Sequence, residues 1–76
     1  MDTNIKTIIS NLIKLGYEKV SSSVYKRQDK DTNYECHFLL SGKMLIIAKD
    51  ESGFNKNKAV EELKKIKGVK KWKMLN

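Results

Sequence analysis

Hydrophobic and polar positions alternate most clearly in the middle of the chain, between residues 34 and 48. The first half reads Tyr-Glu-Cys-His-Phe-Leu-Leu and the second reads Met-Leu-Ile-Ile-Ala, with Ser-Gly-Lys between them. Two such runs around a short break that contains Gly42 are typical of a β-hairpin. Because every second side chain of a strand shares a face, each run predicts one set of residues on one face. These sets are Tyr34, Cys36, Phe38 and Leu40 in the first run, and Met44, Ile46 and Ala48 in the second.

A helical pattern precedes this hairpin, at residues 4–15. Its apolar residues recur at i, i+3, i+4, i+7 and i+8, which is the spacing of an amphipathic helix. We expect Asp2 or Thr3 to accept hydrogen bonds from free N–H groups of the first turn, and Gly16 to end the helix in a left-handed conformation. The predicted apolar stripe consists of Ile5, Ile8, Ile9, Leu12 and Ile13.

A second amphipathic helix is predicted after the hairpin, at residues 56–67. Asn55 is the expected N-cap, and Gly68 is the expected end of the helix. Glutamates lie in its first half and lysines lie near its C-terminus, which suits the direction of the helix dipole. The apolar stripe of this helix consists of Ala59, Val60, Leu63 and Ile66.

The segment between the first helix and the hairpin predicts one strand and a turn. Residues 17–28 contain spaced apolar residues, but three consecutive serines interrupt the alternation, so we expect a bend or a bulge there. Residues 29–33 are a predicted polar turn, and residues 50–55, after the hairpin, are a predicted loop.

Residues 69–75 alternate again and predict a short final strand with Trp72 and Met74 facing inward. The elements then follow the order α-β-β-β-α-β. This order predicts an α+β two-layer sandwich, with an antiparallel sheet of three to four strands and two helices on one face. A single core is expected to contain Leu12, Phe38, Ile46 and Leu63.

The length and composition of the chain predict one small domain, residues 1–76. A domain of this size buries only about 60% of its unfolded surface. No apolar run approaches the roughly 18 residues of a membrane helix, and the first residues lack the positive region of a signal peptide. Cys36 is the single cysteine, whereas secreted domains this small usually contain several disulfides. We therefore expect a cytoplasmic protein without a membrane partner.

Positive charge is concentrated in the last third of the chain. The formal net charge is +7, and residues 54–76 carry eight lysines against two glutamates. Such a cluster is typical of a surface that binds the phosphates of DNA or RNA. Because Arg27 is the only arginine, sequence-specific contacts to bases are not expected. The candidate nucleic-acid-binding residues are Lys56, Lys58, Lys64, Lys65, Lys67, Lys70, Lys71 and Lys73.

Two alternatives explain the same lysines without nucleic acid. Lysine dominates solvated surfaces for solubility alone. The chain also has the size of protein-binding adaptors or inhibitors that phages and mobile elements encode, which would use a bare sheet face or an edge strand. An apolar patch on the bare face would favour the adaptor, whereas a continuous lysine surface beside exposed aromatics would favour nucleic acid.

The sequence predicts no catalytic, cofactor or metal site, and hence no enzyme. Cys36 and His37 are neighbours in a predicted strand, so their side chains point to opposite faces and cannot form a catalytic pair or a zinc site together. We expect Cys36 in the core and His37 at the surface. Asp29, Asp31 and Glu35 approach the spacing of a calcium loop, but its glycine and its final glutamate are absent.

The order of elements resembles that of two RNA-associated families. Double-stranded-RNA-binding domains run α-β-β-β-α and carry lysines at the start of the second helix, where this chain has Lys56 and Lys58 before Ala59. Their alanine-rich continuation is replaced by Glu-Glu-Leu. HicA-type RNA-cleaving toxins have a similar layout with a histidine on a middle strand, where this chain has His37. Their Gly-Ser-His-type lead-in is replaced by Glu-Cys, so the resemblance is one of layout and assigns no family.

Overall fold

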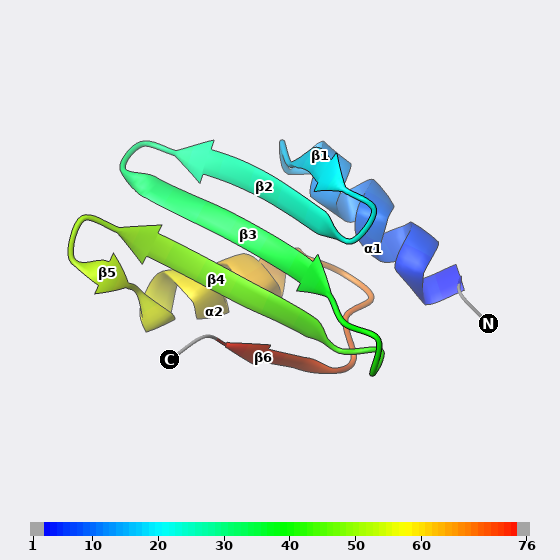
Figure 1. Cartoon of the computed structure of the whole chain (residues 1–76). Coiled ribbons are helices and arrows are strands. Elements are labelled where there is room, and N and C mark those ends of the chain that lie inside the picture. The colour runs from blue at the N-terminus through cyan, green and yellow to red at the C-terminus, as the bar shows by residue number, and fades with distance from the viewer. Residues whose placement is uncertain (1–2, 75–76) are drawn as a thin grey trace.

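The computed structural model describes residues 3–74, which form two helices and a six-stranded sheet (Figure 1). Strands β1 to β5 pair in sequential order and antiparallel, and β6 pairs with β4 in parallel. Since β3 occupies one edge of β4, β5 and β6 share its other edge. The elements are α1 (Thr3–Lys14), β1 (Glu18–Ser21), β2 (Val24–Asp29), β3 (Thr32–Phe38), β4 (Met44–Asp50), β5 (Gly53–Phe54), α2 (Lys56–Lys65) and β6 (Trp72–Met74).

The predicted fold class was wrong in the number and order of its strands. The order is α-β-β-β-β-β-α-β, not α-β-β-β-α-β, and the sheet has six strands where three to four were predicted. Residues 17–28 form a hairpin, because Ser22 and Ser23 are the turn between β1 and β2. The predicted loop at residues 50–55 contains β5, which folds back on the end of β4.

The physical reason for the first error is the exposure of β1. All four of its residues are exposed, so no buried alternation marks it as a separate strand. A register irregularity does occur, but it lies between Lys19 and Ser21, next to the turn. Of the two strands, only β2 has a buried residue, Tyr25, that marks it as a strand in the sequence.

The central hairpin is confirmed as β3 and β4. Its register pairs Tyr34 with Ala48 and Cys36 with Ile46, and all four are buried. The next inward pair joins half-buried Phe38 to buried Met44. The prediction was wrong for Leu40, which follows the end of β3 and is fully exposed in the turn.

The first helix ends as predicted, at Gly16. The N–H of Tyr17 donates to the carbonyl of Leu12 at 2.9 Å, and the N–H of Gly16 donates to the carbonyl of Ile13 at 3.0 Å. This pair of bonds is a Schellman motif, which requires the positive φ of +101° at Gly16. The apolar stripe is wider than the buried face, since Ile13 is 54% exposed. Thr3 is the first helical residue, and Asp2 lies outside the described residues.

The second helix begins as predicted and ends two residues early. The side chain of Asn55 caps it by accepting a hydrogen bond from the N–H of Lys58 at 3.1 Å. Helical backbone stops at Lys65, because Ile66 is extended, with φ −91° and ψ 109°. This change of direction still buries Ile66 in the core, at 4% exposure.

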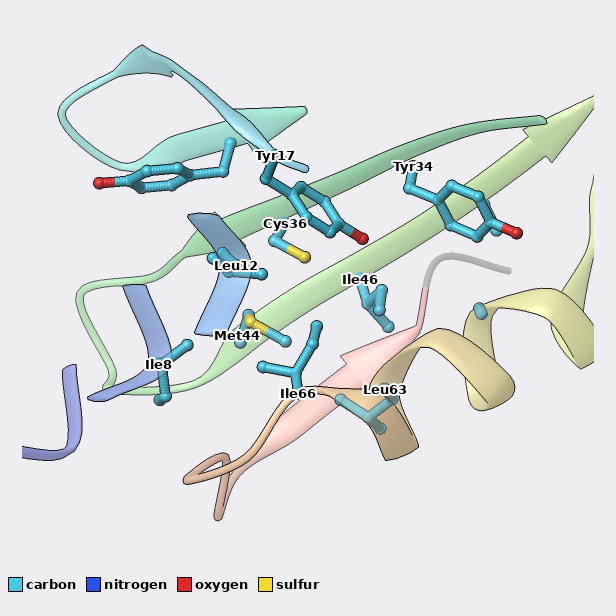
Figure 2. Close-up of a cluster of buried hydrophobic side chains, with 12 residues drawn as sticks. Ile8, Leu12, Tyr17, Tyr34, Cys36, Met44, Ile46, Leu63 and Ile66 are labelled. Atoms are coloured by element: carbon cyan, nitrogen blue, oxygen red, sulfur yellow. The ribbon is translucent and has the colours of Figure 1, made fainter. Parts of the chain in front are cut away.

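The core lies between the two helices and one face of the sheet, and Figure 1 shows both helices on that face. Leu12 of α1 and Leu63 of α2 belong to the same buried cluster as Cys36 and Ile46 of the sheet (Figure 2). In the part of the chain that the structure describes, no helix covers the other sheet face. Neither helix within residues 3–74 is long and apolar enough to cross a membrane.

Candidate nucleic-acid interface

The eight predicted lysines lie on and after the second helix. Four are in α2, three follow it in the connection to β6, and one is in β6. Seven of the eight are exposed, and Lys58 is half-buried. Exposure allows contact with phosphate, but the eight side chains do not form one uniform surface.

Two of these lysines make contacts within the protein. The ammonium of Lys58 donates a hydrogen bond to Oγ1 of Thr32 at 2.7 Å, and Thr32 is only 1% exposed. The ammonium of Lys65 lies 3.9 Å from Oε1 of the buried Glu62. These contacts attach the positive charges of Lys58 and Lys65 to α2 and to the sheet, so we place both residues outside the candidate interface.

The other six lysines have no carboxylate partner among residues 3–74. Within residues 3–74, none of their side chains takes part in a salt bridge or a side-chain hydrogen bond. Lys56 and Lys64 are exposed residues of α2, and Lys67 follows the helix just after the extended Ile66. The remaining three, Lys70, Lys71 and Lys73, lie in and before β6. We call these six residues the free-lysine set.

Trp72 adds an exposed aromatic ring to the free-lysine set. The sequence predicted that Trp72 and Met74 face inward, and Met74 does pack against the core. Trp72 does not, because 43% of it is exposed at the edge strand β6, where its partner is Met44. Sequence analysis therefore missed a candidate site residue. The available signal was the run Lys-Lys-Trp-Lys at residues 70–73, in which the ring stands between charged neighbours.

The other described aromatic side chains lie in the core or pack against it. Tyr17, Tyr25 and Tyr34 are 3%, 4% and 7% exposed, and they point into the core rather than to the open face of the sheet. Among the described aromatic residues, Trp72 is thus the exposed one. Stacking of bases across a sheet face has no support in this arrangement, whereas stacking at the β6 edge has one ring available.

The only arginine is committed to an internal contact. Arg27 donates from Nε to Oε2 of Glu62 at 3.0 Å and from Nη2 to Oε1 at 2.7 Å. The hydroxyl of Tyr17 donates to the same carboxylate at 2.7 Å, and the guanidinium lies 4.4 Å from the ring centre of Tyr34. Burial and the neighbouring carboxylate raise the pKa of Tyr17 well above its usual value. Arg27 therefore holds the fold together and is not free to read bases.

Cys36 and His37 lie on opposite faces of β3, as their spacing predicts. Cys36 is fully buried, and burial raises the pKa of its thiol to about 12, so the thiol is neutral near pH 7. His37 is half-buried on the open face, where its Nε2 lies 2.9 Å from Oε1 of Glu35. Across the described part of the chain, no three His, Cys, Asp or Glu side chains gather in a way that could hold a metal ion.

Comparison with protein-family models, with curated proteins and with solved structures gives no match for this chain.

Proposed function

We propose that this chain is a small non-enzymatic domain that binds nucleic acid in the cytoplasm, through the free-lysine set and Trp72. The observation that carries the proposal is the position of a 43%-exposed indole among lysines that have no carboxylate partner within residues 3–74. Phosphates supply the missing negative charge, and a base can stack on the ring.

The proposed binding tolerates any sequence. Lysine is a point charge that meets phosphate anywhere along a backbone, whereas bidentate recognition of bases is the work of arginine. The single arginine, Arg27, is engaged by Glu62. Single strands are the preferred form, because an unpaired base can reach an edge ring that a base inside a duplex cannot.

A salt titration with a matched charge control tests this proposal. Oligonucleotides are added to the wild type, to a variant with Lys64, Lys67, Lys71 and Lys73 changed to Gln, and to a control with Lys6, Lys14, Lys19 and Lys49 changed to Gln. All eight positions are exposed, and both variants lose the same net charge. The first variant should bind weakly, and its log–log salt slope on single strands should fall by about 0.7 for each phosphate that a lysine no longer neutralises.

The control variant should keep most of the wild-type affinity. Equal weakening in both variants would show that total charge, and not this surface, attracts the nucleic acid. Absence of binding by the wild type at low salt, where counterion release is most favourable, would refute nucleic-acid binding. A protein-binding adaptor or inhibitor would then be the better hypothesis.

The open sheet face, the surface first considered for an adaptor, has a mixed character. Cross-strand rows place Val24 beside His37 and Leu45, and Lys26 beside Glu35 and Ile47. Lys26 and Glu35 lie 3.9 Å apart, so charges of both signs are interspersed with the half-buried apolar residues. This pattern suits a solvated face, which is why nucleic-acid binding ranks first.

A further inference from the structure

A groove at one end of the molecule adjoins the free-lysine set and shares Lys70 and Lys71 with it, but its lining includes neither Trp72 nor any residue of α2. It has a volume of about 370 Å³ and is bounded by the start of α1, by the turn between β3 and β4, and by residues 68–71. Two glycines in these segments, Gly42 and Gly68, leave backbone accessible at its edge. Its apolar lining consists of Ile5, Ile8, Phe38, Leu39, Met44 and Val69.

The charge around this groove has one sign. Lys43, Lys70 and Lys71 line it, and among residues 3–74 no carboxylate does. Lys43 comes from the hairpin turn, far in sequence from the lysine-rich C-terminal segment, so folding brings a third positive charge to the other two. An occupant with carboxylates beside apolar groups would complement both the lining and the lysines.

Exposed apolar side chains extend the groove onto the surface. Ile5 is 43% exposed on the wall formed by α1, and Leu40 is fully exposed in the turn that supplies Leu39 and Lys43 to the lining. Neither side chain is buried in the core, so both are available to contact another molecule. Apolar surface around a concave site, next to charged residues, marks a place where another molecule binds.

We propose that this groove binds an acidic amphipathic segment of another protein. Its apolar side chains would lie against Ile5, Leu40 and the lining, and its carboxylates would pair with Lys43, Lys70 and Lys71. In this mode of recognition a helix lies in a groove, and apolar side chains at positions i, i+3 or i+4, and i+7 of the helix enter the cavity. The site is independent of Trp72, although it shares Lys70 and Lys71 with the free-lysine set. Peptide and nucleic acid should therefore compete.

The probe is a designed helical peptide with Leu anchors on one face and Glu on the other. A scrambled peptide of the same composition keeps the charge and loses the apolar face. NMR spectra should show the backbone amides of Gly42, Gly68 and Val69 shifting with the designed peptide. The scrambled peptide should bind at least about tenfold more weakly, because it cannot bury its leucines together.

Variants at exposed positions separate the groove from the rest of α1. Ile5→Ser and Leu40→Ser should each raise the Kd of the designed peptide about tenfold, since each removes one apolar side chain from the binding surface. Ile13→Ser is the matched control, because Ile13 is an exposed isoleucine of the same helix, at 54% against 43% for Ile5, but does not line the groove. Lys43→Gln should weaken peptide binding and leave binding of single-stranded DNA unchanged. Thermal melts confirm that each variant is folded.

Several results would overturn the proposal. Equal binding of the designed and scrambled peptides would show that charge attraction alone accounts for binding. A decrease in affinity in Ile13→Ser as large as in Ile5→Ser would place the peptide elsewhere on α1. Concentration-dependent self-association that Ile5→Ser abolishes would make a second copy of the chain the occupant. Binding to anionic vesicles, with no binding of either peptide, would identify a lipid surface instead.

Discussion

Arg27 of β2 and Glu62 of α2 face each other across the interior and form two parallel hydrogen bonds, at 3.0 Å and 2.7 Å. Glu62 is 1% exposed and also accepts the Tyr17 hydroxyl, so every strong partner of this carboxylate comes from a distant part of the chain. The helix dipole acts along the axis of α2, so it does not determine which side of the helix Glu62 occupies. The contact with Arg27 instead fixes which side of α2 meets the sheet.

Breaking this pair should destabilise the fold strongly. Glu62→Gln keeps the shape of the side chain but leaves Arg27 with only its longer contact to the exposed Asp29, at 3.7 Å, and the free energy of unfolding should fall by about 3–5 kcal/mol. Chemical denaturation measures this decrease. Replacing both partners, as in Arg27→Met with Glu62→Leu, should cost less than Glu62→Gln alone, because no unpaired charge remains. If Glu62→Gln is as stable as the wild type, the pair does not hold α2 in place.

Core substitutions should separate buried from exposed positions on one helix. Leu12 is fully buried, so Leu12→Ala should cost about 2–5 kcal/mol of unfolding free energy. Ile13, the adjacent residue, is 54% exposed, and Ile13→Ala should cost much less. Leu63→Ala, from α2, should resemble Leu12→Ala. Thermal melts that rank Ile13→Ala with Leu12→Ala would contradict the packing of α1 on the sheet.

Stability should fall as pH rises above 9, mainly because of Cys36, while the raised pKa of Tyr17 adds a smaller decrease from about pH 10. Its thiol has an ordinary pKa of 9.0, and burial raises the folded pKa to about 12. Above pH 9 the unfolded chain loses this proton while the folded chain keeps it, so the unfolded state is favoured. At pH 10 the decrease in stability should be about 1.4 kcal/mol. Denaturation at pH 8 and pH 10 checks this, and Cys36→Ala should remove most of the difference.

Local signals predicted the parts of the fold in which burial follows a regular period. The alternation of Tyr34, Cys36, Ile46 and Ala48 gave the central hairpin with its inward face. Gly16 marked the end of α1, because few other residues adopt its backbone conformation. These features depend on neighbours within a few positions, so the sequence alone contains them.

Other features depend on contacts that cross the chain. All four residues of β1 are exposed and β5 has only two residues, so neither strand contains a burial period, and both are defined by pairing with a neighbouring strand. Trp72 alternates like a core residue, but β6 is an edge strand, where an inward side chain is covered on one side only.

The candidate site shows the same division. Composition located the positive charge, but it could not distinguish Lys58, which is bonded to Thr32, from a lysine that is free to bind. Composition also could not predict that Lys43 lies beside Lys70 and Lys71 at the groove, because these residues come together only when the hairpin packs against residues 68–71.

Trp72 provides the sharpest test of the nucleic-acid hypothesis, since it is the single tryptophan and reports on its own surroundings. Oligonucleotides that stack on the ring should quench its fluorescence, and duplex DNA should quench it less than single strands. Trp72→Leu should weaken single-strand binding by about 1–3 kcal/mol, the usual contribution of one stacked base, while the salt slope stays the same. Lysine substitutions should instead change the salt slope.

The control is Val20→Ser, at an exposed apolar residue on the opposite edge strand, which should leave the affinity unchanged. A Trp72→Leu variant that binds single strands as tightly as the wild type would show that the lysines bind phosphate without a stacking contact.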